Sequence, residues 1–337
     1  LEAIGCGVLV EGNRITGAVV ATPHGRGVVR GRVVIDATGN ADLVAAAGGE
    51  TVYGNGGDDI ALQGSGLPAR PLGQSYVNTD YLLVEDSDVR DVWAALVGVR
   101  QTCPPDLFDL GTQIQNRERR RMVGDHVLCY LDQIIGRTYP DSIVHSESNY
   151  DSHGYPSHPF FALLPHDAKS LKANHPAPGG SCFTPYRCLL PRNLDGILVV
   201  GLGMSMERDA SAMVRMQRDL QNQGYAAGVA AAMVVRQGVS TRELDVRVLQ
   251  EHLVAVGNLP PEVLHHEDNF PFDQAAVATA VEELTKSDRL AAARALAVVL
   301  AHREAAEPLL LAAFRKAQDE SRLTYAKILG FWGDTEV

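Results

Sequence analysis

The first hydrophobic runs of the chain are rich in β-forming residues. Gly5 to Val10 and Arg14 to Ala21 are two such runs, and Glu11-Gly12-Asn13 between them is typical of a hairpin turn. A third run, Val28 to Ile35, follows a turn at His24-Gly25-Arg26-Gly27. The pattern therefore predicts a β-meander at the start of the chain.

A strand, a glycine turn and a long helix are predicted between Asp195 and Val235. The apolar run Ile197 to Val200 predicts a strand buried on both faces, and Gly201 and Gly203 predict a turn. In the helix, apolar and small residues recur every three or four positions, so one face is expected to allow close backbone packing. These residues are Met213, Met216, Leu220, Gly224, Ala227, Ala231 and Val234. A helix N-terminus after such a turn suits an anionic or electron-rich ligand group.

Helical spacing dominates the chain after Gly238. Thr241 to Val256 is expected to form a helix, with Leu244, Val248 and Leu249 among its apolar positions. From Gln274 onward we expect four short helical segments. Their breaks are predicted near Ser287-Asp288, His302-Arg303, Pro308 and Asp319-Glu320. Helix pairs of this length predict a HEAT-like tail that either binds a protein partner or only packs on the rest of the chain.

Composition narrows the class of protein. A hydrophobic content of 45% and a charged content of 21% are typical of a globular protein. The net charge of -11 argues against binding to nucleic acid or to an anionic membrane surface, and no apolar stretch is long enough to span a membrane. Five irregularly spaced cysteines favour free thiols in a reducing compartment, so a cytoplasmic location is expected.

The turn at Gly201 is not a complete dinucleotide fingerprint. Met206 stands where the third glycine is required, and the nearest well-spaced acid, Asp219, lies inside the predicted helix. A second turn of interest follows the meander, in the segment VVIDATGNADL from Val33 to Leu43. An ordinary strand-to-helix turn, with Asp36 or Asn40 as helix cap, is the alternative interpretation of that segment.

These two segments resemble a known family. GLGMSMERDAS-x-MVRMQ-x-DLQNQGYAAGVAAA looks like the C-terminal cofactor segment of FAD-dependent oxidoreductases related to the glutathione-reductase-type flavoproteins, which have two dinucleotide-binding folds. The ATG turn is similar to the internal motif with which that family returns from a β-meander to its FAD domain. The resemblance implies FAD as cofactor and a small-molecule substrate. It also implies cofactor contacts from Asp36, Ala37, Thr38, Gly39, Asp42, Gly201, Gly203, Arg215, Met216 and Gln217.

The resemblance also implies a domain division and a fold class. We expect an α/β protein with an incomplete, N-terminally truncated FAD-binding Rossmann-like domain, an inserted α+β substrate domain and an all-α helical-repeat tail. Its segments are 1–50 (meander and ATG turn), 51–185 (substrate domain), 186–240 (last strand and helix of the FAD domain) and 241–337 (tail). Within the inserted domain, Asp88 to Arg100 predicts an amphipathic helix with Val89, Val92, Trp93, Leu96 and Val97 on its apolar face.

A basic block lies inside the inserted domain. Asn116 to Gly124 holds four arginines in five residues, which on charge alone is typical of a solvated face paired with acids. The family resemblance extends to this block, where Arg117, Glu118, Arg120, Arg121 and Gly124 match an R-E-x-R-R-hydrophobic-x-Gly pattern. Since arginine binds carboxylates and phosphates and holds negative charge near a reduced flavin, Arg117 and Arg120 are candidate catalytic residues.

Histidines and cysteines offer weaker candidates. His145, His153, His158, His166 and His175 lack the spacing of a zinc motif, so no metal site is expected, although one of them is a candidate proton donor or acceptor. Cys182 and Cys188 are too far apart for a Cys-x-x-Cys redox pair and are expected to be buried structural thiols.

Three functions remain open from the sequence. The first is an FAD-dependent oxidoreductase of unspecified substrate. The second is a non-enzymatic helical-repeat scaffold on a flavoprotein-like fold, and the third is a histidine-rich metal hydrolase. A yellow protein, a colourless protein that binds a partner through its tail, and a protein that copurifies with zinc are the observations that separate them.

Overall fold

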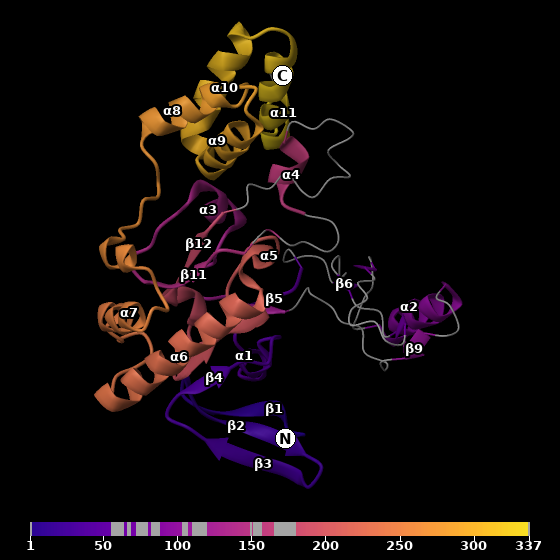
Figure 1. Ribbon diagram of the computed structural model, residues 1–337, viewed down its shortest axis with the longest axis vertical. Coiled ribbons are helices and arrows are strands. Elements are labelled where there is room, and N and C mark those ends of the chain that lie inside the picture. The colour runs from indigo at the N-terminus through magenta and orange to yellow at the C-terminus, as the bar shows by residue number, and fades with distance from the viewer. Residues whose placement is uncertain are drawn as a thin grey trace.

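The computed structural model describes residues 2–54, 64–65, 69–71, 80–81, 88–102, 107–109, 120–148, 150, 157–164 and 180–335 (Figure 1). The strands are β1 (Ile4–Glu11), β2 (Arg14–Thr22), β3 (Gly25–Arg30), β4 (Val34–Asp36), β5 (Thr51–Val52), β6 (Gly64–Ser65), β7 (Ala69–Pro71), β8 (Asp80–Tyr81), β9 (Leu107–Asp109), β10 (Arg121–Met122), β11 (Ser142–Ser146), β12 (Cys182–Pro185) and β13 (Ile197–Val199). The α-helices are α1 (Asp42–Ala46), α2 (Val89–Thr102), α3 (Tyr130–Ile135), α4 (Pro159–Leu163), α5 (Ser211–Val214), α6 (Gln217–Gln237), α7 (Val246–Ala255), α8 (Gln274–Glu283), α9 (Arg289–Ala301), α10 (Arg303–Lys316) and α11 (Asp319–Trp332). Short 3-10 segments are η2 (Tyr186–Leu189), η3 (Gly201–Gly203) and η4 (Pro261–His265).

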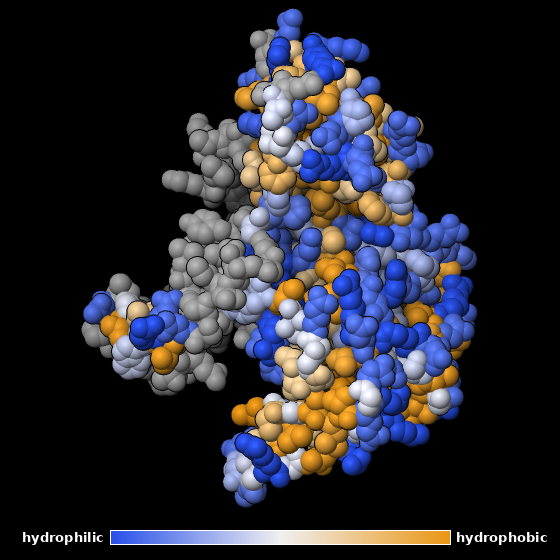
Figure 2. All heavy atoms as spheres, turned by 180° about the vertical axis from the view of Figure 1, so that it is seen from behind, coloured by the Kyte–Doolittle hydropathy of each residue, from blue (hydrophilic) through white to orange (hydrophobic). Residues whose placement is uncertain are grey.

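The N-terminal meander β1–β2–β3 is antiparallel, as predicted, and Gly12 takes a positive φ of 65° in the hairpin turn. The prediction of a single strand from Val28 to Ile35 was wrong. This run is divided into β3 and β4, because the chain leaves the meander after Arg30 and β4 pairs with β13 in another sheet. The sheet lies at one end of the molecule, where Figure 2 shows apolar residues gathered on the surface. Ile4, Val28 and Val29 are among the exposed apolar side chains.

A parallel pair of strands, β4 and β13, connects two segments that are far apart in sequence. Val34 pairs with Ile197 and Asp36 with Val199, and all three residues of β13 are fully buried, as predicted. The backbone N–H of Val200 donates to the carbonyl of Asp36 at 3.0 Å, so the register continues to the end of both strands. The carboxyl ends of β4 and β13 therefore lie next to each other.

The buried face of α6 differs from the predicted one. The chain breaks at Arg215 and Met216, so Met213 belongs to the separate helix α5 and the helical phase restarts at Gln217. Gly224 is exposed, and a Cβ there meets no atom within 4 Å, so this glycine does not serve close backbone packing. The buried residues of α6 are Asp219, Gln223, Ala226, Ala227, Ala230, Met233 and Val234. Hydrophobic periodicity missed Asp219 and Gln223 because both are polar side chains that bond to other segments.

Short antiparallel strand pairs and helices make up the described part of 51–185. The pairs are β5–β10, β6–β8, β7–β9 and β11–β12. Helix α2 forms where it was predicted, with Asp88 accepting from the backbone N–H of Arg90, but its expected apolar face is largely open. Leu96 is buried, whereas Val89 and Trp93 are 77% and 65% exposed.

The helical segment after Gly238 contains α7 and then α8 to α11. Helix α7 begins at Val246, five residues later than predicted, because the Asp245 side chain caps it by accepting from the N–H of Arg247. The predicted break at Pro308 was wrong, since this proline lies inside α10. An interior proline costs about 3 kcal/mol, which the burial of Ala306, Leu310 and Phe314 on the same stripe offsets.

One continuous hydrophobic cluster runs from residue 128 to residue 329 and includes side chains of α3, β11, α6 and α8 to α11. Helix α9 packs against α3 and α4, so the last four helices rest on the middle of the molecule (Figure 1). None of the helices in the described part of the chain is long and apolar enough to cross a membrane.

Candidate functional site

The ATG turn at the end of β4 is organised by a buried carboxylate. Asp36, which is 1% exposed, accepts hydrogen bonds from the backbone N–H and hydroxyl of Thr38 and from the N–H groups of Leu43 and Val44 at the start of α1. The Thr38 hydroxyl in turn accepts from the N–H of Asp42 at 3.0 Å. The N-cap residue of α1 is Ala41, so neither Asp36 nor Asn40 is the N-cap, but the Asp36 carboxylate binds the N–H groups of the first turn of α1 from the preceding strand. Ala37 and Thr38 are exposed on the outside of the turn.

The glycine turn at the end of β13 lies directly against the ATG turn. Gly201 takes a positive φ of 78°, and a Cβ built on Gly203 comes within 2.7 Å of the backbone nitrogen of Ala41. A real Cβ does not approach a nitrogen so closely, so only glycine permits this contact. Gln223 in the second turn of α6 fixes the arrangement by accepting from the N–H of Gly201 at 2.5 Å.

The N-terminus of α6 follows the break at Arg215 and Met216. Met216 is the N-cap residue, without a side-chain hydrogen bond, and its carbonyl accepts from the N–H of Leu220 at 3.0 Å. Gln217 is exposed at the first helical position, while Arg215 and Met216 are half-buried. The backbone N–H groups of the first turn lack intrahelical acceptors, as at every helix start.

Arg120 binds the ATG turn itself. Its guanidinium donates to the carboxylate of Asp42 at 2.5 Å and to the carbonyl of Asn40 at 3.0 Å, and its backbone N–H donates to the Asn40 side chain. The arginine block is therefore brought to the same edge of the β4–β13 pair as the two turns. Arg117, the other predicted catalytic residue, lies outside the described residues together with Glu118 and Arg119.

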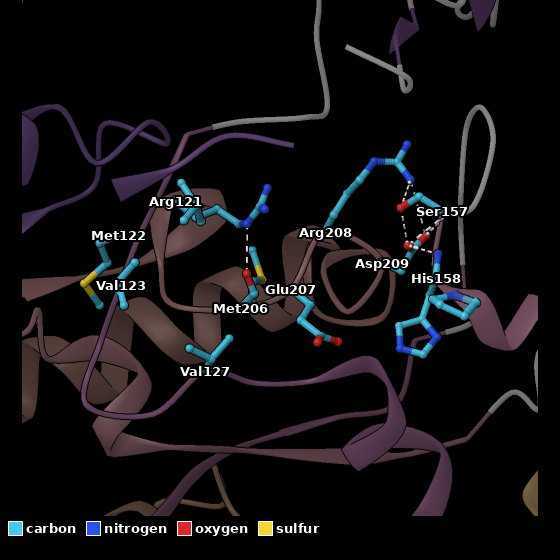
Figure 3. Close-up of a pocket in the computed structure, with 12 residues that line it drawn as sticks. Arg121, Met122, Val123, Val127, Ser157, His158, Met206, Glu207, Arg208 and Asp209 are labelled. Atoms are coloured by element: carbon cyan, nitrogen blue, oxygen red, sulfur yellow. Dashed lines mark hydrogen bonds and ion pairs between the residues drawn. The ribbon is translucent and has the colours of Figure 1, made fainter. Parts of the chain in front are cut away.

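A cavity of about 550 Å³ lies beside the segment that follows the glycine turn (Figure 3). Its walls come from the β5–β10 pair, the loop before α3, the start of α4 and residues 206–209. The lining residues are Val52, Arg121, Met122, Val123, Val127, Ser157, His158, Pro159, Met206, Glu207, Arg208 and Asp209. Arg215, Met216 and Gln217 are not among them, so the cavity is distinct from the predicted cofactor contacts on α6.

Of the two histidines of the predicted stretch that the structure describes, His145 and His158, it is His158 that lines this cavity. It caps α4, because its Nδ1 accepts from the backbone N–H of Phe160 at 3.1 Å. Burial lowers the pKa of His158 below its ordinary value of 6.5, and the nearby carboxylates of Glu207 and Asp209 partly oppose this shift. The ring is therefore neutral at pH 7, with its proton on Nε2.

Asp209 and Arg208 hold the wall that carries His158. The Asp209 carboxylate, 2% exposed, accepts from the Tyr150 hydroxyl, from the N–H and hydroxyl of Ser157 and from the N–H of His158. The Arg208 guanidinium donates to the Ser157 hydroxyl at 3.0 Å. These bonds connect the segment after β13 to the segment before α4.

Sequence reasoning missed Glu207, Arg208, Asp209 and Arg121 as cavity residues. Three consecutive ionisable residues between buried neighbours in MERDAS were the available signal, since charged side chains are seldom buried unless they are paired. Arg121 was assigned to the family pattern but not to a cavity. It is 3% exposed, and its guanidinium donates to the carbonyls of Met206 and Gly54.

The thiol prediction is confirmed for Cys182 and Cys188, which are free and buried. Burial raises the pKa of Cys182 to about 12 and raises that of Cys188 as well, so neither forms a reactive thiolate at neutral pH. Of the remaining predicted histidines, His145 stacks on Phe183, while His153, His166 and His175 lie outside the described residues. Within the described part of the chain, no group of three or more His, Cys, Asp or Glu side chains is placed to hold a metal ion.

The chain matches one known protein family. The family described as FAD dependent oxidoreductase matches residues 1–96 and 85–253, which is most of the 337-residue chain and includes both turns, the arginine block and the cavity. No curated protein and no solved structure matches the chain. The β4–β13 pair accordingly belongs to a Rossmann-like α/β fold. The chain therefore belongs to the FAD dependent oxidoreductase family, and it is an oxidoreductase whose cofactor is FAD.

Proposed function

We propose that FAD is held across the two turns at the carboxyl ends of β4 and β13, in a fold of the glutathione-reductase type. The observation that carries this proposal is the contact between Gly203 and Ala41, which brings together two segments more than 150 residues apart. In open α/β sheets, ligands bind beyond the carboxyl ends of the parallel strands. The residues proposed to line the cofactor are Asp36, Ala37, Thr38, Gly39, Asp42, Gly201, Gly203, Arg215, Met216 and Gln217.

The chemistry of these residues fits FAD. The exposed backbone of Ala37 and Thr38 and the side-chain-free surface at Gly201 leave room for close approach of a ligand; a Cβ on Gly201 meets no atom within 4 Å. The N–H groups at the start of α6 favour a ligand edge that carries negative charge. When bound, FAD supplies transfer of a hydride or of single electrons, and the protein supplies orientation and electrostatics.

Arg120 is proposed to position the cofactor turn. Its three hydrogen bonds to Asn40 and Asp42 keep the ATG turn in place against Gly203. The guanidinium also partly neutralises Asp42, which otherwise places a negative charge beside the proposed cofactor. The role of Arg117 at the substrate or flavin stays a prediction.

The domain division and the tail complete the proposal. We assign 1–50 and 186–240 to the FAD domain, 51–185 to a substrate domain and 241–337 to a HEAT-like extension. The pairing of α8 with α9 and of α10 with α11 supports the last assignment. A small-molecule substrate, a protein partner on the tail and a cytoplasmic location stay predictions.

Hydrogen–deuterium exchange tests the proposed cofactor site. We expect protein loaded with FAD to show slower exchange than FAD-depleted protein at 37–46, 201–204 and 215–219, because bound ligand both covers these amides and suppresses local opening. The helices α8 to α11 provide the internal control and are expected to exchange at the same rate in both samples. Protection confined to other segments, with no change at the two turns, would overturn the assignment.

A further inference from the structure

The cavity beside residues 206–209 contains one carboxylate that is more exposed than its neighbours. Residues 203–214 are all buried except Glu207, which is half-buried and lines the cavity. One of its oxygens accepts from the backbone N–H of Tyr130 at 2.8 Å, the first helical position of α3. This bond anchors the carboxylate to the cavity wall.

A hydrogen-bond donor lies on the same cavity. Because Nδ1 of His158 accepts from the N–H of Phe160, the neutral ring carries its proton on Nε2. In Figure 3 the ring of His158 and the carboxylate of Glu207 extend into the same space. A ligand atom between them finds an acceptor on one side and a donor on the other.

The two arginines of the cavity are engaged by protein groups. Arg121 donates to the carbonyls of Met206 and Gly54, and Arg208 donates to Ser157 and pairs with Asp209. An anionic ligand group would therefore compete with existing bonds of these guanidiniums and would meet the negative charge of Glu207. An apolar surface, including Met122, Val123 and Val127, makes up much of the remaining wall.

We propose that this cavity is the substrate subsite and that it takes an uncharged molecule with a hydroxyl group on an apolar body. The hydroxyl donates to Glu207 and accepts from Nε2–H of His158, which uses both capacities of an alcohol oxygen. A carboxylate is repelled by Glu207. An ammonium is attracted by Glu207 but is repelled by the guanidiniums of Arg121 and Arg208 on the same cavity, and it has no lone pair for the His158 donor. The inference rests on the proposed function only in treating the ligand as the substrate of a flavoenzyme.

Three probes of matched size test the class of ligand: cyclohexanol, cyclohexanecarboxylate and cyclohexylammonium, titrated by ligand-observed NMR at neutral pH. We expect cyclohexanol to bind at least about 10-fold more tightly than the other two, the factor expected for one poorly matched or missing buried hydrogen bond. Equal or tighter binding of the carboxylate or of the ammonium overturns the proposal.

Two conservative variants test the residues. Glu207→Gln keeps an acceptor for the Tyr130 N–H but removes the charge, so we expect it to bring cyclohexanecarboxylate within about 3-fold of cyclohexanol. His158→Asn keeps an N-cap for α4 but removes the Nε2–H donor, so we expect cyclohexanol to bind about 10-fold more weakly. Glu304→Gln, an exposed change in α10 far along the chain, is the matched charge control and is expected to bind all probes as wild type does.

The flavin content of each sample separates this inference from the proposed function. If Glu207→Gln and His158→Asn both retain flavin and both bind the three probes as wild type does, the proposed substrate class is contradicted and the cofactor site is not. If the protein shows the expected probe preference but holds no flavin at the two turns, the proposed cofactor site is contradicted and the substrate class is not.

Discussion

The strand-end region and the C-terminal helices bury their residues in different ways. At the ends of β4 and β13 and in the segment that follows, the buried side chains include Asp36, Arg208, Asp209 and Gln223, each with hydrogen bonds to neighbouring segments. In the described part of α8 to α11, buried side chains are mostly Ala, Leu and Val, and His302 is the buried polar one.

Buried polar side chains and buried apolar side chains therefore serve different purposes in the two regions. A buried polar group costs free energy unless its hydrogen bonds are made, so a protein gains nothing by burying four of them for packing alone. In the proposed cofactor site, Asp36 and Gln223 hold the two turns in one conformation, and Arg208 and Asp209 hold the wall of the neighbouring cavity. The helices α8 to α11 need only an apolar stripe, which alanine and leucine supply.

The largest expected effect comes from comparing two aspartates whose carboxylates bind N–H groups at the start of a helix. Asp36→Ala removes an acceptor of four hydrogen bonds from a buried position and leaves the N–H groups of Leu43 and Val44 without it, so we expect a loss of about 3 kcal/mol in the free energy of unfolding and loss of bound FAD. Asp288→Ala removes an exposed cap at α9 and is expected to cost about 1 kcal/mol with full FAD content.

Urea denaturation and the visible absorbance of the flavin measure both quantities on the same samples. Equal losses of stability in the two variants, or FAD retained at wild-type stoichiometry by Asp36→Ala, would contradict the distinction between the two regions.

The next effect is a dependence of stability on pH that originates at two half-buried histidines, His158 on the cavity wall and His126 in the loop before α3. Burial lowers the pKa of His158 and of His126 in the folded protein, so the unfolded chain binds more protons than the folded one below about pH 6.5. Stability contributed by these neutral histidines is fully present above that pH and is lost as the pH falls through their folded pKa values. The slope stays below roughly 1.4 kcal/mol per pH unit for each histidine, because the unfolded chain binds at most one more proton per histidine than the folded protein does.

Thermal melts between neutral and mildly acidic pH check this prediction. We expect His158→Asn to weaken the pH dependence, since the N–H of Phe160 keeps an acceptor that does not titrate. A His252→Asn variant, at a half-buried histidine of α7 that does not line the cavity, serves as the control for the loss of one histidine. A melting temperature that rises on acidification would give the wrong sign.

The smallest effect is expected from thiol modification. Iodoacetamide is expected to alkylate the exposed Cys6 in the native protein and to leave Cys182 and Cys188 intact, because their thiols are buried and protonated. Peptide mass spectrometry locates the modified cysteines, and flavin content is expected to stay constant. Rapid labelling of Cys188 would show that its thiol is reactive and would contradict its assignment as a buried structural thiol.

Local sequence signals predicted much of the fold. The hairpin at Gly12, the buried strand β13 and the turn at Gly201 were recognisable because each depends on a few neighbouring residues. Hydrophobic periodicity failed on α6, where the break at Met216 resets the helical phase and polar Asp219 and Gln223 occupy the buried face. It also failed at Pro308, where packing of the flanking residues overrides local propensity.

The candidate site was harder to predict because its contacts are long-range. Arg120 was singled out as a ligand-facing residue, yet its bonds to Asn40 and Asp42 depend on a turn 80 residues away. Nothing in the sequence distinguished His158 from the other four histidines, since its place on the cavity is set by Asp209, which bonds to its backbone N–H.

The most direct test of the central claim is the FAD stoichiometry of Gly203→Ala measured beside Gly224→Ala. The first change places a Cβ within 2.7 Å of the Ala41 nitrogen and pushes the two turns apart, whereas the second places one in open space on α6. We predict that purified Gly203→Ala loses most of its flavin while Gly224→Ala keeps it and unfolds at the same or a higher temperature. Wild-type flavin content in folded Gly203→Ala would contradict the claim that these two turns together hold the cofactor.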